Sequence, residues 1–216
     1  MPSENALGLL SPDERDFVST LPATDRESLR RLAPMLRPSF ASVQERDAAY
    51  TGLGLSDAPT CVIPSEGAEY KWDGRQWLAY DLRPKSFDPG WFSGSDLQRL
   101  TNTGGSSIGW YIRRGHTYEW QIVFTRGTTA AGANVGSGYY SWLLPFPSWS
   151  YNSTGTGYVR NGPAGSMEVD GSVVMRDSTH VSLLSGASRI GTASFETIAD
   201  GFTAVLSGVH RLGGLL

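Results

Sequence analysis

The sequence predicts a mainly β protein whose C-terminal part, residues 107–216, forms an antiparallel β-sandwich. From Ser107 to Arg211 the chain is a series of short apolar alternations with turn residues about every 8–12 positions, as in sandwiches and barrels. No amphipathic pattern of helix length interrupts this series, and 26 glycines and 12 prolines supply many turns. We expect the rest of the chain to add a short helical anchor over residues 1–52 and a small β-hairpin adaptor with a linker loop over 53–106.

Composition and charge exclude several kinds of partner and site. A formal net charge of −3, without any run of basic residues, gives no attraction to phosphate backbones, so we expect no nucleic-acid partner. Cys61 is the only cysteine, which excludes an intrachain disulfide and a Cys-rich zinc site. The sequence begins without a signal-peptide pattern, and no stretch reaches the ~18 apolar residues of a membrane span. We therefore expect assembly in a cytoplasm, without membrane insertion.

The first 52 residues carry three helix-start signals of the form Ser/Thr-x-x-Glu, at 11–14, 24–27 and 42–45. In this pattern the hydroxyl and the carboxylate each accept a hydrogen bond from an unpaired amide of the first turn. Prolines interrupt the segments, so short helices are expected, each with one apolar face. The residues expected to anchor the chain on a neighbouring subunit are Phe17, Leu21, Leu29, Leu32 and Leu36. The alternative is that these faces pack on the chain's own C-terminal domain.

Apolar alternations on both sides of Asp73-Gly74 predict a hairpin unit over residues 60–80. Asp-Gly between such alternations is typical of a two-residue turn in which both residues take positive φ. Two or three strands alone are marginally stable, so this unit is expected to lean on another part of the chain or on a partner. Residues 81–105 are expected to form a connecting loop that the side chains of Trp91 and Phe92 hold in place.

The C-terminal part is expected to contain eight strands joined by antiparallel hairpins or Greek-key crossings. Turns are expected at Arg114-Gly115 and at Asp170-Gly171. This pattern excludes a parallel α/β enzyme fold. The expected strands are 108–114, 116–126, 138–146, 156–161, 166–169, 172–177, 180–185 and 202–211.

No sequence motif points to catalysis. The three histidines lie far apart without metal-ligand spacing, and no serine occupies a G-x-S-x-G elbow. Cys61 lies in an apolar run and is expected to be a small buried hydrophobe. Glycoside hydrolysis needs two facing carboxylates, and Glu119 and Glu168 are the strand candidates, although ordinary alternation favours a solvent-facing position. We expect no enzymatic activity, no cofactor and no metal.

Aromatic residues are the strongest indication of function, because Trp and Tyr rings stack on sugars and dominate protein interfaces. Tyr118, Trp120 and Ile122 share one strand face, which favours a core stripe over a ligand platform. The segment PSWSYNSTG differs, since its aromatic residues flank small polar ones in a turn-rich setting. The candidate contact residues for a ligand are therefore Trp149, Tyr151, Asn152 and Tyr158.

Two sets of segments resemble parts of bacteriophage proteins. In sequence order, the first set is IGWYIRRGHTYEWQIVF at 108–124, YYSWLLPFP at 139–147, GTGYVRN at 155–161, VVMRDSTHVSLL at 173–184 and IADGFTAVLSGVH at 198–210. It resembles the C-terminal domain of bacteriophage minor tail and fibre proteins. Upstream, FASVQERDAAY at 40–50 followed by EYKWDGRQW at 69–77 resembles the small adaptor of phage fibre and tail proteins.

These resemblances imply a structural virion protein with a jelly-roll-like sandwich that is assembled as a homotrimer. The N-terminal helices would dock on other virion proteins, while the sandwich would project for host adhesion, with a cell-surface glycan as a candidate ligand. The chain is shorter than the common members, so a tail fibre and a ligand-free capsid decoration or head fibre both stay open. The alternative from another class is a carbohydrate-binding module or a weak glycan hydrolase.

Overall fold

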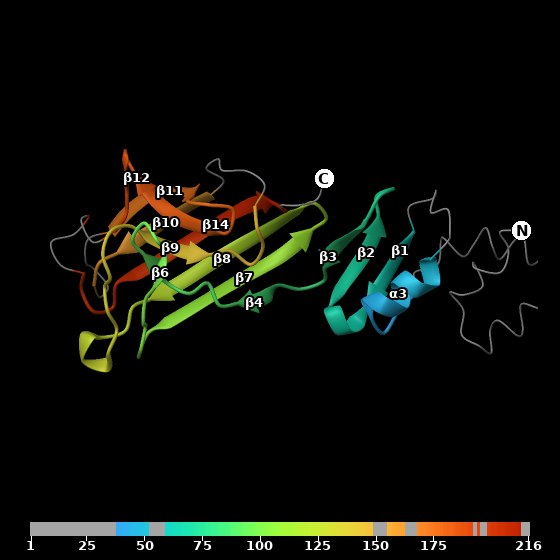
Figure 1. Cartoon of the computed structure of the whole chain (residues 1–216), viewed down its shortest axis with the longest axis horizontal. Helices are drawn as coiled ribbons and strands as arrows, with labels where there is room; N and C mark the ends of the chain where they lie inside the picture. The colour runs from blue at the N-terminus through green and yellow to red at the C-terminus, as the bar shows by residue number, and fades with distance from the viewer. Residues whose placement is uncertain are drawn as a thin grey trace, which may run out of the picture. The chain divides into compact units, whose positions relative to one another are not determined.

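The described residues form two compact units that divide after Arg83. Their helix is a single short one and their paired strands are all antiparallel, which confirms the predicted mainly β, sandwich-like fold (Figure 1). The computed structural model describes residues 38–51, 59–148, 155–162, 168–191, 194 and 198–212.

The smaller unit consists of one helix and a three-stranded antiparallel sheet in the order β1-β2-β3. The helix begins at the third predicted signal, because Ser42 Oγ accepts a hydrogen bond from the Glu45 amide at 3.1 Å. The Glu45 carboxylate accepts from the Ala41 amide at 2.7 Å, one residue earlier than expected for a capping box. The elements are α3 (Val43–Tyr50), β1 (Thr60–Ile63), η3 (Pro64–Glu66), β2 (Ala68–Trp72) and β3 (Trp77–Asp81).

A buried arginine lies at the centre of this unit. Arg46 is 5% exposed, and its guanidinium carbon lies 4.7 Å from the centre of the Tyr70 ring and 4.9 Å from that of Trp77. Cation–π contacts of this kind stabilise more when water is excluded. Asp47 accepts two hydrogen bonds from the same guanidinium, at 2.7 and 2.9 Å. The helix is therefore joined to the sheet through Arg46.

The predicted hairpin at Asp73-Gly74 is present, but the predicted two-residue turn is wrong. The pairing of Trp72 with Trp77 leaves a loop of residues 73–76. Gly74 has a φ of 99°, whereas Asp73 does not take positive φ. Instead the Asp73 carboxylate accepts hydrogen bonds from the two following loop amides, at 2.8 and 2.9 Å. This side-chain bonding closes the wider loop.

The larger unit is one antiparallel sheet with the strand order β7-β8-β14-β10-β11-β12-β9-β5-β6, with β4 beside β7 and β13 beside β12. Figure 1 shows the long strands β7 and β8 running side by side. The first strands are β4 (Lys85–Phe87), β5 (Phe92–Ser93), β6 (Gln98–Arg99), β7 (Ser106–Arg114), β8 (Thr117–Thr125) and β9 (Tyr140–Leu143). The others are β10 (Gly155–Arg160), β11 (Glu168–Met175), β12 (His180–Ser185), β13 (Ser188–Arg189) and β14 (Thr203–Arg211), and η4 spans Thr129–Ala131.

Two expectations for this unit need correction. Residues 81–105 are not only a loop, because β4, β5 and β6 lie within them. Trp91 does hold this segment on the core, because its side chain is buried at 1% exposure. Asp170-Gly171 is not a turn but the middle of the continuous strand β11. Gly171 pairs with Gly157 of β10, and a Cβ on Gly171 would lie 2.2 Å from the Leu184 carbonyl oxygen. This glycine therefore permits close strand approach.

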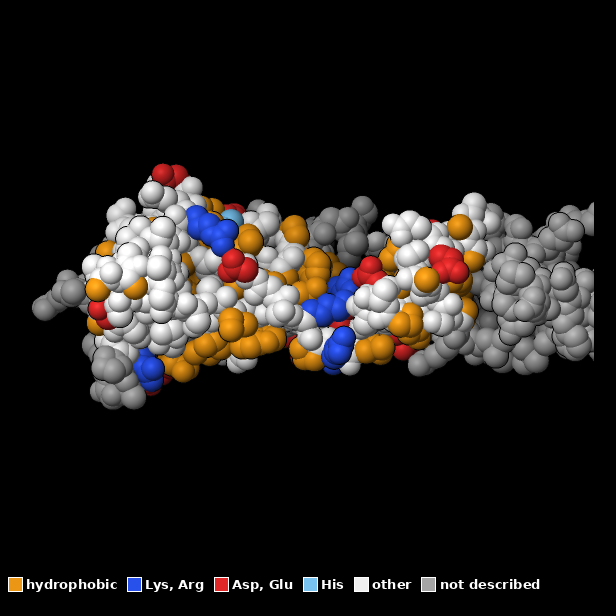
Figure 2. All heavy atoms as spheres, turned by 90° about the horizontal axis from the view of Figure 1, so that it is seen from below, with side chains coloured by type: hydrophobic (Ala, Val, Ile, Leu, Met, Phe, Trp, Pro, Cys, Tyr) orange, Lys and Arg blue, Asp and Glu red, His pale blue; other side chains and the backbone are white. Residues whose placement is uncertain are grey.

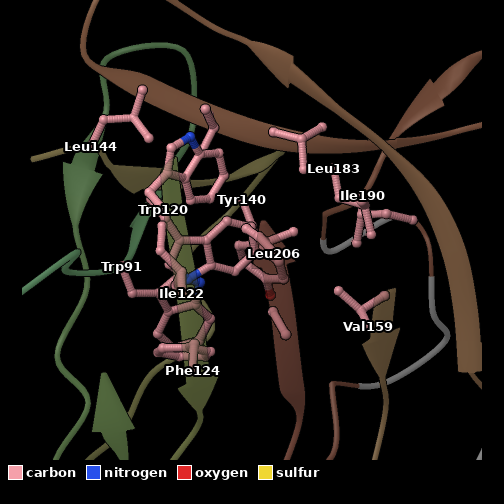
Figure 3. Packing of buried hydrophobic residues seen from close by; sticks show 14 of the residues in the cluster. Trp91, Trp120, Ile122, Phe124, Tyr140, Leu144, Val159, Leu183, Ile190 and Leu206 are labelled. Atoms are coloured by element: carbon pink, nitrogen blue, oxygen red, sulfur yellow. The ribbon is translucent and has the colours of Figure 1, made fainter. Parts of the chain in front are cut away.

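The core explains why the sheet folds over. β8 and β9 are separated by four strands in the sheet order, yet Phe124 and Trp142 pack with ring centres 6.0 Å apart. Figure 3 shows Ile122 and Phe124 of β8 in one cluster with Leu206 of β14 and residues of the β9 and β12 side. The stripe of Tyr118, Trp120 and Ile122 is buried here, as predicted. One curled sheet thus supplies both layers of the sandwich.

We expect Phe124→Ala to lower the free energy of unfolding by about 3–5 kcal/mol, because it removes a fully buried ring and leaves a cavity. Urea unfolding followed by tryptophan fluorescence measures the change. Gln121→Ala on the exposed side of the same strand is the control and should change the unfolding free energy by less than about 0.5 kcal/mol. Equal losses in the two variants would contradict the assignment of the core.

Candidate functional site

The described residues include one of the four predicted contact residues. Tyr158 lies on β10, half buried, and points away from the core that its neighbour Val159 enters. The predicted contacts Trp149, Tyr151 and Asn152 lie outside the described residues. So do the predicted anchor residues, which are Phe17, Leu21, Leu29, Leu32 and Leu36.

An apolar row crosses the outer side of four neighbouring strands. Ile108 of β7 pairs with Val123 of β8, Val123 with Val205 of β14, and Val205 with Tyr158 of β10. Because side chains alternate along a strand and the residues between these are buried, all four point away from the core. Trp110, Ile112 and Val209 project from the same side, and we call these seven residues the outer face.

The outer face is exposed and carries little charge. Ile108 is 44% exposed, Trp110 38% and Val209 50%. Figure 2 shows hydrophobic side chains gathered in a band along the side of the larger unit. Glu119 lies between Ile112 and Val209, with which it pairs, so its predicted solvent-facing position is confirmed. Three further exposed charged residues project from the same side next to the outer face, and they are Arg114, Arg211 and Asp170. Monomeric proteins seldom leave a contiguous apolar surface of this kind uncovered.

A pocket lies on the layer of the sandwich that contains β9, β12 and β13. Its cavity of about 390 Å³ is lined by Tyr139 beside β9, by Ser185 of β12 and by both residues of β13, Ser188 and Arg189. Ser194 completes the polar lining, and Val169 and Ile190 supply apolar surface. The volume lies within the range of about 300–1,000 Å³ that is typical of small-molecule sites.

Sheet pairing assembles this pocket from segments that are distant in the sequence. β13 returns beside β12 through a hairpin in which Ser185 pairs with Ser188. Tyr139 forms an isolated antiparallel bridge with Gly191, which follows β13. Tyr139 is 49% exposed, because the next residue, Tyr140, takes the core position of this strand. Serine, tyrosine and arginine in short strands gave no sequence motif, so sequence reasoning missed this site.

A second cavity, of about 320 Å³, lies beside Trp91. Its charged groups, Asp88 and Arg99, form an ion pair at 2.7 Å with both side chains more than 60% exposed. The opposite charges compensate each other, and exposed pairs contribute little to stability. This cavity therefore presents no net charge to a ligand.

The titratable groups in the described residues do not form a catalytic set. Asp177 and His180 lie 3.0 Å apart. Burial raises the pKa of Asp177, but hydrogen bonds from Thr179 and His180 outweigh burial and keep it below its usual value. No hydrogen bond joins His180 to a serine in the described part of the chain. Burial raises the pKa of Cys61 to about 11, which fits the predicted buried, unreactive thiol.

The carboxylates proposed for hydrolysis lie on strands that are not neighbours. Glu119 is on β8 and Glu168 on β11, with β14 and β10 between them. Three strand spacings of about 4.8 Å already exceed the ~5–9.5 Å between catalytic carboxylates of glycosidases. Within the described residues, no group of three or more His, Cys, Asp or Glu side chains lies close enough to hold a metal ion.

Two further findings concern the chain as a whole. The described part of the chain contains no helix of the length and apolarity that crossing a membrane requires. Comparison of the chain with protein-family models, with curated proteins and with solved structures finds no match.

His210 is a buried titratable group. It is 2% exposed, lies against the Tyr118 and Trp120 rings, and neither of its ring nitrogens has a hydrogen-bond partner among the described residues. Burial lowers the pKa of His210 from 6.5 to about 4. The folded state therefore keeps this imidazole neutral over a pH range in which the unfolded chain binds a proton.

We expect the protein to lose stability as the pH falls from 6.5 to about 4, since only the unfolded chain takes up this proton in that window. A pKa difference of this size corresponds to about 3 kcal/mol, and the loss stops growing below pH 4. Urea unfolding at a series of pH values measures it. His210→Leu should remove this component of the slope, and an unchanged slope in that variant would contradict the assignment.

Proposed function

We propose that this protein is a structural virion protein of a bacteriophage, of the minor tail or fibre type. Its β-sandwich assembles as a homotrimer and presents a surface for adhesion to the host, while its N-terminal segment docks on other virion proteins. The observation that carries the proposal is the outer face, an apolar row across four strands of a well-packed sheet. The sequence resemblance to phage tail and fibre proteins supports placing the protein in a virion.

The outer face supports self-association on energetic grounds. Covering a fully exposed aliphatic or aromatic side chain is worth about 1.5–3 kcal/mol, and Ile108, Trp110 and Val209 are each between one third and one half exposed. No single residue therefore supplies enough binding free energy for assembly, but the residues of the row are neighbours and can be covered together by one partner surface. Glu119 lies at one end of the face, and the exposed Arg114 is its diagonal neighbour on β7. Arg211 lies at the same end, and Asp170 pairs with Tyr158 at the other side of the row. The charges that a further copy of the chain would have to pair or leave in solvent therefore lie around the row of Ile108, Val123, Val205 and Tyr158 and not within it.

The same surface also supports the second structural reading, a capsid decoration or head-fibre protein without a ligand. Both proposed functions need an association surface, and they differ only in whether the C-terminal sandwich also contacts the host. The pocket beside Tyr139 favours the adhesive function, because an open polar cavity can hold a ligand and a ligand-free decoration protein does not require one. We therefore place adhesion ahead of decoration.

We expect light scattering behind a sizing column to give a mass of three chains, about 70 kDa for a chain of 23.4 kDa. The double variant Ile108→Arg, Val209→Arg should shift the mass to one chain, because each interface would then bury an unpaired charge. Leu82→Arg changes another exposed apolar residue, outside the outer face, and should leave three chains. A wild-type monomer would remove the trimer from the proposal.

Adhesion is tested on the phage particle that carries the chain. Replacing Trp149 and Tyr151 by Ala should reduce host adsorption while particles assemble normally, because these residues are the predicted ligand contacts in a turn-rich segment. Adsorption assays with purified particles measure the effect, and immunoblotting of the same particles verifies that the protein is incorporated. Unchanged adsorption with normal incorporation would exclude these two residues as contacts.

A further inference from the structure

We propose that the pocket beside Tyr139 binds a carboxylated sugar residue of an acidic glycan. Tyr139 supplies a stacking surface, Arg189 binds the carboxylate, and the serines at the rim bind sugar hydroxyls. This inference rests on the adhesive function proposed above and names the class of ligand. It uses residues that belong neither to the outer face nor to the predicted contacts.

The polar groups of the pocket are free to bind a ligand. Among the described residues, none makes a hydrogen bond to the side chains of Tyr139, Ser185, Ser188 or Arg189. Ser194 Oγ accepts one bond, from the Gly191 amide at 3.0 Å, and keeps its own proton to donate. Polar side chains that line a concave surface without internal partners are satisfied by water or by a ligand. Their hydroxyl and guanidinium chemistry matches the hydroxyls and the carboxylate of a sugar acid.

The aromatic wall favours a sugar over a small inorganic anion. Tyr139 is one of the few large apolar side chains of the described residues that stay exposed, with 49% of its surface open to solvent. An exposed tyrosine ring offers a flat apolar surface and a polar tip, which suits the apolar face and the hydroxyl rim of a pyranose. A phosphate or sulfate ion alone has no group that would use this ring.

The charge of the pocket favours one carboxylate over a phosphate group. Arg189 is the charged side chain of the lining, and its planar fork of N–H donors binds a carboxylate through two parallel hydrogen bonds. A phosphomonoester carries ≈ −1.5 to −2 charges at pH 7, so one guanidinium would leave part of that charge uncompensated. Arg176 lies close enough to Arg189 that, after burial, the charge of Arg189 is the main influence lowering the pKa of Arg176.

Arg176 does not serve as a second ligand group, because its hydrogen bonds are used within the fold. Its Nη1 donates to Ser141 Oγ at 3.1 Å, and its Nη2 donates to the Gly94 carbonyl oxygen. Its charge also interacts with Asp177 and Asp96, so Arg189 is the guanidinium that stays available to a ligand. This division of roles predicts that a substitution at Arg189 removes ligand binding without loosening the sheet.

The test measures binding of methyl glucuronide to the full chain by saturation-transfer NMR, with methyl glucoside, methyl glucoside 6-sulfate and acetate as comparison probes. We expect the glucuronide to bind at least about tenfold more tightly than the other three, because only it offers both a stacking ring and a carboxylate. Failure of the glucuronide to bind would overturn the proposal, and so would equal or tighter binding of any comparison probe.

Variants separate the roles of the pocket residues. Arg189→Gln should weaken glucuronide binding by about tenfold or more, and Tyr139→Ala should do the same, whereas Tyr139→Phe keeps the ring and most of the binding. Arg75→Gln is the matched control, since it removes the same charge from an exposed position on the hairpin loop of the other unit. Equal binding by Arg189→Gln and Arg75→Gln would overturn the assignment of Arg189.

Mass measurements on the same samples separate this inference from the proposed function. A three-chain mass without glucuronide binding would leave the assembly proposal standing and overturn the ligand assignment. A one-chain mass with Arg189-dependent binding would do the reverse, and would then support a monomeric carbohydrate-binding module.

Discussion

The structure of the larger unit depends on the contact between β8 and β9 across the sandwich. The Phe124 ring of β8 packs on Trp91 and Trp142, with ring centres 4.8 and 6.0 Å away, although four strands separate β8 from β9 in the sheet. This closure turns one curled sheet into two layers and buries a set of rings that no disulfide reinforces. Gly157 and Gly171 make it possible, because a Cβ at either position would collide with a carbonyl oxygen of the next strand.

Closure also gives the two layers different outer surfaces. The β7, β8, β14 and β10 layer buries Tyr118, Trp120 and Phe124 inside. It leaves the row of Ile108, Val123, Val205 and Tyr158 on its outer side, where apolar side chains can pack against another flat surface. On the β9 and β12 side the residues turned away from the aromatic core include polar ones: Ser141 and Ser182 are buried and hydrogen-bonded at 2.9 Å, and Arg176 joins Ser141 to the β5–β6 turn. The pocket beside Tyr139 lies on this side, so the proposed association surface and the proposed ligand site use different residues.

Period-two alternation predicted the fold, because burial follows it directly in strands such as β8, with Tyr118, Trp120 and Ile122 inside. Single glycines were harder to interpret. Asp170-Gly171 has the composition of a turn, but Gly171 lies within β11, where the absence of a side chain lets β12 come close. The pocket lay beyond sequence reasoning, since Tyr139 meets Arg189 only through the sheet order. His210 was missed because alternation does not reveal whether a buried imidazole finds a partner.

A pocket with one guanidinium and one aromatic wall would bind a single sugar weakly, and the proposed trimer would compensate for this. A millimolar Kd at one site corresponds to a binding free energy of about −4 kcal/mol. Three such sites in the proposed trimer, engaging one glycan-coated surface, would exceed the single-site affinity by ~10² to 10⁴ when their spacing matches the surface. Because the pocket and the outer face share no residue, association through the outer face would leave each Arg189 in place for binding. Weak sites that act together also dissociate one at a time, so the proposed virion protein would let a particle move across a host surface before firm attachment.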